Sequence, residues 1–147
     1  MSNHALYTIG FTKKNAETFF SRLKEAGVTK IIDVRLNNVS QLAGFAKRDD
    51  LIYFLRNLID CDYVHMLDFA PTKNILDSYK KKLIDWNGYE DQFKKLIKER
   101  KIEKRVSAEE LKNACLLCSE HVADQCHRRL IAEYLEKNIL NIQIKHL

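Results

Sequence analysis

The chain has 147 residues, of which 46% are hydrophobic and 31% are charged, with one proline and four glycines; this predicts one domain spanning residues 1–147 and excludes a wholly disordered, collagen-like or turn-dense β-barrel protein. No apolar run approaches the roughly 20 residues that span a bilayer, and the N-terminus lacks the pattern of a signal peptide, so we expect a soluble, cytoplasmic protein with no membrane partner. The net charge of +5 is compatible with a nucleic-acid partner, but much of the excess lies between Lys80 and Arg105, where basic and apolar residues alternate as on solvated helix faces.

The first half of the sequence alternates short apolar runs with amphipathic helical segments. Thr12 or Asn15 can cap a first helix, which Gly27 ends, and Asp49 is expected to cap a second helix. Both helices carry apolar residues spaced three or four apart, as on one face of a helix. The strands expected in this half are residues 6–9, 31–34 and 63–66.

The second half begins with a highly charged segment, residues 72–105, whose pattern predicts helices with a break near residues 87–88. Ser107 opens a capping box at the start of a further short helix. An apolar run bounded by polar residues then indicates a buried parallel strand. The elements expected here are this strand at 114–117, a helix at 126–137 and a last strand at 142–144.

This order of elements predicts an α/β fold. Strands that alternate with helices are joined by right-handed crossovers, which make the strands parallel and place helices over the sheet. We therefore expect a single three-layer domain, with a mostly parallel sheet of about five strands and helices on both of its faces.

Polar and nucleophilic residues follow the ends of four of the predicted strands. Ligands of open parallel sheets bind beyond the carboxyl ends of the strands, so these residues are expected to share one pocket. They are Gly10 and Thr12 after the first strand, Asp33 and Arg35 at the second, His65 at the third, Cys118 and Glu120 at the fourth, and Cys126, His127, Arg128 and Arg129 at the start of the following helix.

Two cysteines are candidate nucleophiles. Cys126 begins a helix, where the macrodipole and the unpaired N–H groups lower the pKa of a thiol and favour an anion, and the three basic residues after it strengthen both effects. Cys118 follows a strand, in a loop whose amides can stabilise an attacking thiolate and its oxyanion. The alternative is that both thiols only fill the core and that the arginines pair with Asp124, Glu133 or solvent.

Metal binding is another use of the cysteines. Cys115 and Cys118 form a Cys-x2-Cys pair, and Cys126 with His127 would complete four zinc ligands. Against a structural zinc site, Cys115 lies inside the apolar strand, and two adjacent residues are poorly placed to hold one ion together. We therefore predict no metal site. The cofactor stays unassigned. The sequence has neither a P-loop nor a GxGxxG pattern, so P-loop nucleotide hydrolysis and a standard dinucleotide fold are unsupported.

The remaining polar residues can bind substrate or transfer protons. Asp33 and Arg35 lie two apart on a strand and point the same way, so Arg35 can hold a phosphate or carboxylate while Asp33 orients a sugar hydroxyl or Arg128. His65 and Glu120 can transfer protons. Each of these residues also has a structural alternative. Asp33 and Arg35 can pair with the two arginines that follow Cys126. His65 can be a hydrogen-bonded structural residue, and Glu120 can be the partner of an ion pair.

Five segments, in this order, resemble the signatures of the DUF488 family, a domain of uncharacterised function found widely in prokaryotes. They are residues 8–12, 32–35, 63–65, 116–120 and 126–128. The loop after the second segment keeps the serine of the family pattern, Ser40, but has Gln41 where the family usually has arginine. The resemblance implies a compact α/β domain with a polar pocket that takes part in nucleotide or nucleic-acid transactions.

Two functions follow from these residues. The first is an enzyme that acts on an anionic substrate, either a nucleotide or a nucleic-acid-related molecule. Its thiolate would be Cys118 or Cys126, its proton-transfer groups Glu120, His127 and His65, and its substrate-binding residues Gly10, Thr12, Asp33, Arg35, Ser40, Arg128 and Arg129. The alternative is a non-catalytic nucleic-acid-binding or regulatory module that uses the basic helices of residues 80–105.

Overall fold

The computed structural model describes residues 4–39, 44–119 and 126–147. Its strands are β1 (His4–Gly10), β2 (Lys30–Asp33), β3 (Asp62–His65), β4 (Ala114–Cys118) and β5 (Ile142–His146). Its α-helices are α1 (Ala16–Ala26), α2 (Arg48–Ile59), α3 (Lys73–Lys80), α4 (Trp86–Arg100), α5 (Ala108–Leu111) and α6 (His127–Asn138), and short 3-10 turns lie at Gly44–Ala46, Leu67–Phe69 and Ile102–Lys104. Within these residues, no helix has both the length and the apolar character that crossing a membrane requires.

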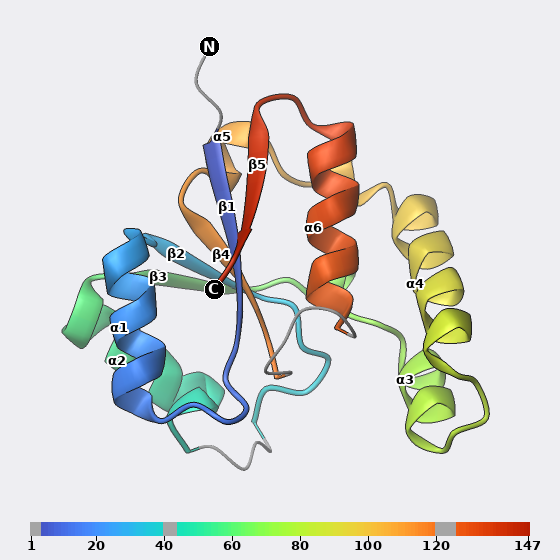
Figure 1. Cartoon of the computed structure of the whole chain (residues 1–147), viewed down its shortest axis with the longest axis horizontal. Helices are drawn as coiled ribbons and strands as arrows, with labels where there is room; N and C mark the ends of the chain where they lie inside the picture. Colours follow the sequence, from blue (N-terminus) through green and yellow to red (C-terminus); the bar gives the residue numbers. More distant parts are fainter. Residues whose placement is uncertain (1–3, 40–43, 120–125) are drawn as a thin grey trace.

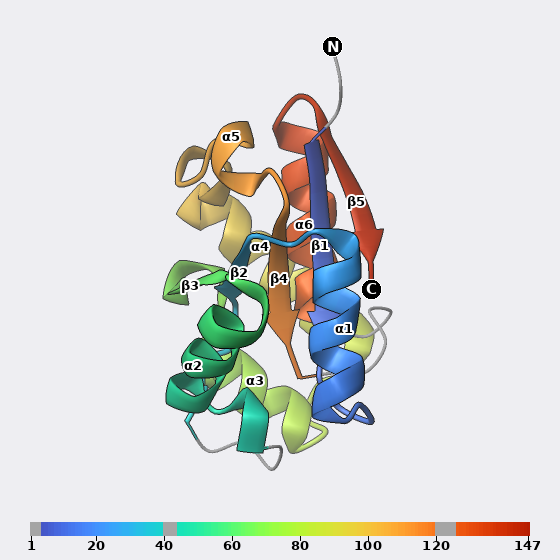
Figure 2. The same cartoon turned by 90° about the vertical axis from the view of Figure 1, so that its left-hand side faces the viewer.

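The five strands form one parallel sheet in the order β3-β2-β4-β1-β5. Helices α1 and α2 cover one face, and α3, α4 and α6 cover the other, so that the sheet lies between two helical layers (Figure 1). Figure 2 looks onto α1 and α2 and shows α4 and α6 behind the strands. The predicted three-layer α/β fold is therefore confirmed, together with its parallel sheet of five strands.

Each face of the sheet has its own hydrophobic core, and β4 contributes to both. Alternate side chains of a strand point to opposite faces. Leu116 and Cys118 thus belong to the core under α3, α4 and α6, whereas Cys115 and Leu117 belong to the core under α1 and α2. Cys115 and Cys118 consequently point away from each other, which rules out the Cys-x2-Cys metal pair.

The chain reverses its direction across the sheet between the neighbouring strands β1 and β4. From β1 it passes through α1 towards β2, and from β4 it passes through α6, on the opposite face, towards β5. The carboxyl ends of two strands at such a switch point border the crevice in which α/β proteins bind ligands. Gly10 and Cys118, which end these strands, lie side by side in the strand register.

Several helix ends follow their predicted caps. The Asn15 side chain accepts a hydrogen bond from the backbone N–H of Thr18 and so caps α1, and the left-handed backbone of Gly27 (φ 77°) ends that helix. Ser107 likewise caps α5 by accepting from the N–H of Glu110.

Two predicted helix boundaries are wrong. Lys47, not Asp49, is the cap residue of α2, and Asp49 lies in the first turn, where its carboxylate still favours the helix dipole. The break in the charged segment lies before Trp86 rather than at residues 87–88. The Asp85 side chain accepts from the N–H of Gly88 and starts α4 there, so that the Asn-Gly pair is helical.

Candidate functional site

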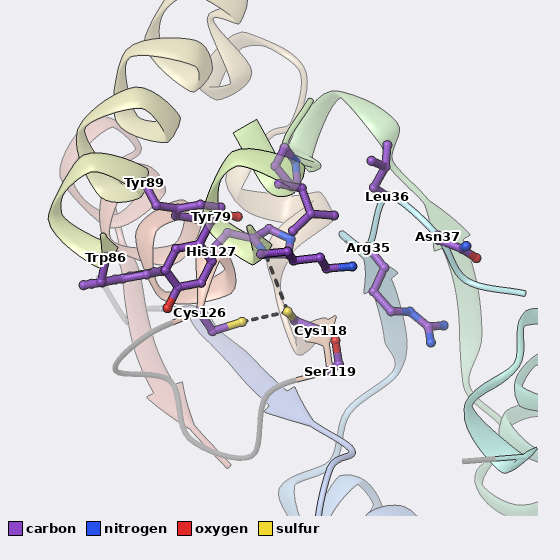
Figure 3. Close-up of a pocket in the computed structure, with 13 residues that line it drawn as sticks. Arg35, Leu36, Asn37, Tyr79, Trp86, Tyr89, Cys118, Ser119, Cys126 and His127 are labelled. Carbon is purple, nitrogen blue, oxygen red and sulfur yellow. Dashed lines mark hydrogen bonds between the residues drawn. The ribbon is translucent and has the colours of Figure 1, made fainter. Parts of the chain in front are cut away.

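A cavity of about 350 Å³ opens at the carboxyl ends of the central strands. The backbone N–H of Val34, just after β2, donates to the carbonyl of Leu117 in β4 across 3.1 Å, which holds the ends of the two strands together. Figure 3 shows side chains from both segments and from α4 and α6 around the cavity. The cavity is lined by Arg35, Leu36, Asn37, Pro71, Leu76, Tyr79, Lys80, Trp86, Tyr89, Cys118, Ser119, Cys126 and His127.

Cys118 lies at the centre of this site. Its Sγ is 2.7 Å from the Sγ of Cys126, which donates the hydrogen bond, and 3.5 Å from Nδ1 of His127 (Figure 3). Cys126 is the cap residue of α6 and His127 is its first residue, so the N-terminus of a 12-residue helix faces the sulfur. The end of β4 and the start of α6, which were expected to share one pocket, are thus in direct contact.

The backbone fixes the orientation of the His127 ring. Nε2 of His127 lies 2.6 Å from the carbonyl oxygen of Val34, and the ring packs edge-on against Phe93. Because a carbonyl oxygen can only accept a hydrogen bond, Nε2 carries the hydrogen and Nδ1 is directed at Cys118. The imidazole is therefore held in place to exchange a proton with the Cys118 sulfur.

The three side chains shift each other's ionisation. Burial raises the pKa of Cys118, but the hydrogen bond from Cys126 and the charge of His127 outweigh it and hold this pKa well below the usual value of a thiol. Burial lowers the pKa of His127, yet the charge of Cys118 and the hydrogen bonds to Cys118 and Val34 raise it above its usual value. The lowered pKa of Cys118 and the raised pKa of His127 both favour a thiolate–imidazolium pair.

The other thiols have the opposite character. Burial and the charge and hydrogen bond of Cys118 raise the pKa of Cys126 well above its usual value, so that Cys126 stays protonated and donates to the thiolate. Burial raises the pKa of Cys115 well above that value and the pKa of Cys61 to about 12. Among the four cysteines, only Cys118 therefore has a lowered pKa, which favours its thiolate form.

Asp33 and Arg35 form a buried ion pair beside the cavity. Nε and Nη2 of Arg35 donate to the two carboxylate oxygens of Asp33 across 2.9 and 2.8 Å, and Nη1 donates to the carbonyl of Ala46. Tyr63 donates a further hydrogen bond to Asp33. The guanidinium points away from the sulfurs in Figure 3, and its hydrogen bonds position the loop after β2.

The remaining predicted residues lie around this centre. Nε2 of His65, at the end of β3, is 2.7 Å from the carbonyl oxygen of Arg35, and the backbone N–H of Thr12 donates to the carbonyl of Ser119. Arg128 is fully buried with Nε 3.3 Å from the Thr8 hydroxyl, and its charge helps to lower the pKa of Cys118.

Arg129 points towards other partners than the cavity. Its guanidinium pairs with Glu90 and with Glu133, at 3.2 Å each. Glu133 is one of the partners that the sequence offered for the arginines of this helix. Ser40 and Glu120, both predicted site residues, lie outside the described residues.

An aromatic wall that the sequence analysis missed borders the cavity opposite Arg35 (Figure 3). Trp86 and Tyr89 stack with ring centroids 5.1 Å apart and an interplanar angle of 18°, and Tyr79 packs against both. Trp86 and Tyr89 are three residues apart and therefore share one face of α4. That spacing was the available signal, but the charge of the surrounding segment indicated a solvated helix.

Cys118, Cys126 and His127 are also the described residues that could share a metal ion, since their ligand atoms lie within 4.8 Å of one another. Two thiolates bound to one tetrahedral zinc ion at about 2.3 Å would be about 3.8 Å apart. The two sulfurs, at 2.7 Å, would have to separate by about 1 Å to hold such an ion. The observed spacing instead fits a hydrogen-bonded thiol and thiolate.

One family model matches the chain. It is described as "Domain of unknown function DUF488" and covers residues 15–135. The matched segment runs from the cap of α1 to within α6 and includes the cysteines, His127 and the Asp33–Arg35 pair. Neither a search of curated proteins nor a search of solved structures returned a match.

Proposed function

The chain belongs to the DUF488 family of unknown function, and we propose that it is an enzyme whose Cys118 thiolate attacks an anionic, ring-bearing substrate such as a nucleotide. One observation carries the proposal: the Cys118 sulfur lies in a cavity, 2.7 Å from the Cys126 thiol and 3.5 Å from the His127 ring. A buried thiolate needs such partners, because an isolated buried charge is costly.

The proposed reaction begins with nucleophilic attack by Cys118. Its Sγ forms a bond to the electrophilic atom of the substrate, while the bond to the leaving group breaks and the leaving group keeps the electron pair. The imidazolium of His127 gives its proton to the leaving group. A water molecule or an acceptor then displaces Cys118 and returns a proton to His127, so that the thiolate–imidazolium pair is restored.

The walls of the cavity suit a planar, negatively charged molecule. Trp86 and Tyr89 offer aromatic faces on which a nucleobase can stack. Lys80, at the end of α3, and the N-terminus of α6 provide positive potential for a phosphate. The volume of about 350 Å³ is within the range of small-ligand sites.

The alternative function, a nucleic-acid-binding module built on the basic helices, has less support. Several cations of that segment already contact protein groups. Lys94 pairs with Glu90 at 3.3 Å, Arg105 pairs with Asp68 at 3.0 Å, and Arg100 donates to the carbonyl of Ala70. The two ion pairs neutralise part of the charge that would attract a phosphate backbone, and the hydrogen bond of Arg100 holds its guanidinium against the protein.

Alkylation of the full-length protein tests the proposed function. Iodoacetamide is added at pH 6.5 with and without adenosine monophosphate, and peptide mass mapping gives the rate at each cysteine. We expect Cys118 to react at least about tenfold faster than Cys61 and the nucleotide to slow this reaction. If Cys118 reacts no faster than Cys61, the nucleophilic role is wrong. If it reacts rapidly but neither nucleotide nor inorganic phosphate protects it, the proposed substrate class is wrong.

A further inference from the structure

The sulfurs of Cys118 and Cys126 are in contact although both cysteines are free thiols. Their separation of 2.7 Å is about 0.7 Å longer than a disulfide bond. The other two cysteines, Cys61 and Cys115, belong to the core on the opposite face of the sheet. The two cysteines in contact are therefore each other's nearest partners for covalent chemistry.

We propose that Cys118 and Cys126 form a reversible disulfide that switches the site off in response to small-molecule disulfides. The formation of the bond depends on the two thiols and on His127 and does not require the proposed enzymatic activity. Its regulatory meaning rests on the proposed function, because the bond consumes the nucleophile. It would make the site sensitive to the thiol–disulfide balance of its surroundings.

The backbone around the two cysteines permits the small approach that the bond requires. Cys118 is the last residue of β4, and Cys126 precedes the first turn of α6 with an extended backbone (φ −141°, ψ 139°). Neither residue lies inside a helix. Cys126 contributes to the first turn of α6 through its carbonyl oxygen, which accepts from the N–H of Arg129, and not through its sulfur, so that the sulfur can change partner without loss of that hydrogen bond.

The two cysteines have different roles in the reaction with a small disulfide, RSSR. The Cys118 thiolate attacks one sulfur, the S–S bond of RSSR breaks, and the departing thiolate takes a proton from His127 to leave as RSH. This step gives a mixed disulfide between Cys118 and R.

Cys126 then resolves the mixed disulfide. Its proton passes to the neutral His127 ring, whose nitrogen lies within 4.8 Å of the sulfur. The Cys126 thiolate attacks the Cys118 sulfur, and the second RS⁻ leaves with the proton from His127. Two protein thiols are oxidised to one disulfide, and RSSR is reduced to two RSH. Attack by a reducing thiol runs the same steps backwards.

The ionisation of the pair supports this division of roles. The thiolate is the attacking form in disulfide exchange, and Cys118 has the lowered pKa. Cys126, with its raised pKa, stays protonated until the mixed disulfide removes the negative charge beside it. Both residues line the cavity, so a reagent that enters the cavity meets them together.

Oxidised glutathione serves as the probe in the test. The reduced full-length protein and its Cys118→Ser, Cys126→Ser and Cys61→Ser variants are equilibrated with mixtures of reduced and oxidised glutathione and quenched in acid. Free thiols are then labelled with N-ethylmaleimide, and intact mass and peptide mapping identify the products. The Cys61→Ser variant is the matched control, because Cys61 belongs to the core on the opposite face of the sheet and takes no part in the proposed bond.

We expect the wild type and the Cys61→Ser variant to lose two labelled thiols and to contain a Cys118–Cys126 link. Cys126→Ser should stop at one glutathione on Cys118, and Cys118→Ser should remain reduced at the same mixture. Failure of the wild type to form the link in oxidised glutathione alone overturns the proposal, as does an equal amount of glutathione on Cys61.

The alkylation of Cys118 separates this inference from the proposed function. Absence of the link in a protein whose Cys118 still alkylates rapidly and is protected by nucleotide disproves the switch alone. Formation of the link in a protein whose Cys118 is no more reactive than Cys61 disproves the proposed function and the regulatory meaning of the bond, but it leaves the disulfide itself established. In the linked protein, Cys118 alkylation should fall at least about tenfold and return after reduction with dithiothreitol.

Discussion

Nε2 of His127, the first residue of α6, lies 2.6 Å from the carbonyl oxygen of Val34, the residue after β2. This contact joins two segments 93 positions apart in the sequence and determines which ring nitrogen faces Cys118. The reactivity of the thiol therefore depends on the end of β2 as well as on its own strand.

Replacement of His127 by glutamine should raise the pKa of Cys118, because the positive charge that stabilises the thiolate is lost. At pH 6.5 the alkylation rate of Cys118 should fall at least about tenfold, because an ordinary thiol, with a pKa of about 8.5, is only about 1% ionised at that pH. The rate at Cys118 is measured with iodoacetamide from pH 5 to pH 9, and Cys61 in the same protein is the internal control. An unchanged pH profile would show that His127 does not stabilise the thiolate.

The contribution of the thiolate–imidazolium pair to the free energy of unfolding should be constant over a range of pH and should fall on both sides of that range. The lowered pKa of Cys118 contributes stability that is present above its unfolded value, about 8.5, and is lost as the pH falls through the folded value. The raised pKa of His127 contributes stability that is present below its unfolded value, about 6.5, and is lost as the pH rises through the folded value.

Between about pH 6.5 and 8.5 the two slopes cancel, because the folded pair and the unfolded pair each hold one proton. Outside this window the contribution should fall by about 1.4 kcal/mol per pH unit on either side. The measurement is the free energy of urea unfolding from pH 5.5 to 9.5, taken as the difference between the wild type and the Cys118→Ser/His127→Gln double variant, which lacks both titrating groups. A difference that rises steadily across the window would contradict the ion pair.

Asp33→Asn should destabilise the protein by about 3–5 kcal/mol, because it leaves the charge of Arg35 buried without its partner. Urea unfolding at pH 7 gives the change in the free energy of unfolding. The matched control is Asp49→Asn, which breaks the exposed Arg48–Asp49 pair at 3.0 Å. If Asp33→Asn lowers the free energy of unfolding no more than the control does, the buried Asp33–Arg35 pair does not stabilise the fold.

Trp86→Ala should weaken nucleotide binding without changing the alkylation rate of the free protein. Loss of one stacking surface costs about 1–3 kcal/mol, so the concentration of adenosine monophosphate that halves Cys118 alkylation should rise at least about fivefold. Trp86→Phe keeps an aromatic face and should retain most of the protection. Equal protection in both variants would remove the aromatic wall from the substrate site.

The order of the elements could be predicted from the sequence because periodicity and caps are local properties. The alternation of apolar runs and amphipathic segments is sufficient to indicate a parallel sheet. The prediction failed where one side chain decides between two local options, as at Asp85, which starts α4 ahead of an Asn-Gly pair that usually marks a turn.

The position of Cys118 beside Cys126 and His127 followed from the rule that the ends of parallel strands meet at one edge. The contacts themselves did not follow, because the distance between two sulfurs depends on how α6 packs on β4. Arg35 shows a second limit. It was expected to hold a ligand, but its guanidinium turns back onto Asp33 and donates to the carbonyl of Ala46, a contact between distant segments that the local sequence does not indicate.

The ultraviolet absorbance of the thiolate tests the central claim most directly. The wild type and Cys118→Ser are titrated from pH 5 to pH 10, and the difference between their absorbances follows the ionisation of Cys118. A parallel titration of Cys126→Ser shows how much Cys126 contributes. The thiolate–imidazolium pair predicts that the difference is already present at pH 6.5, below the range in which an ordinary thiol ionises. A difference that develops only near pH 8.5 or above, as for an ordinary thiol, would contradict the claim.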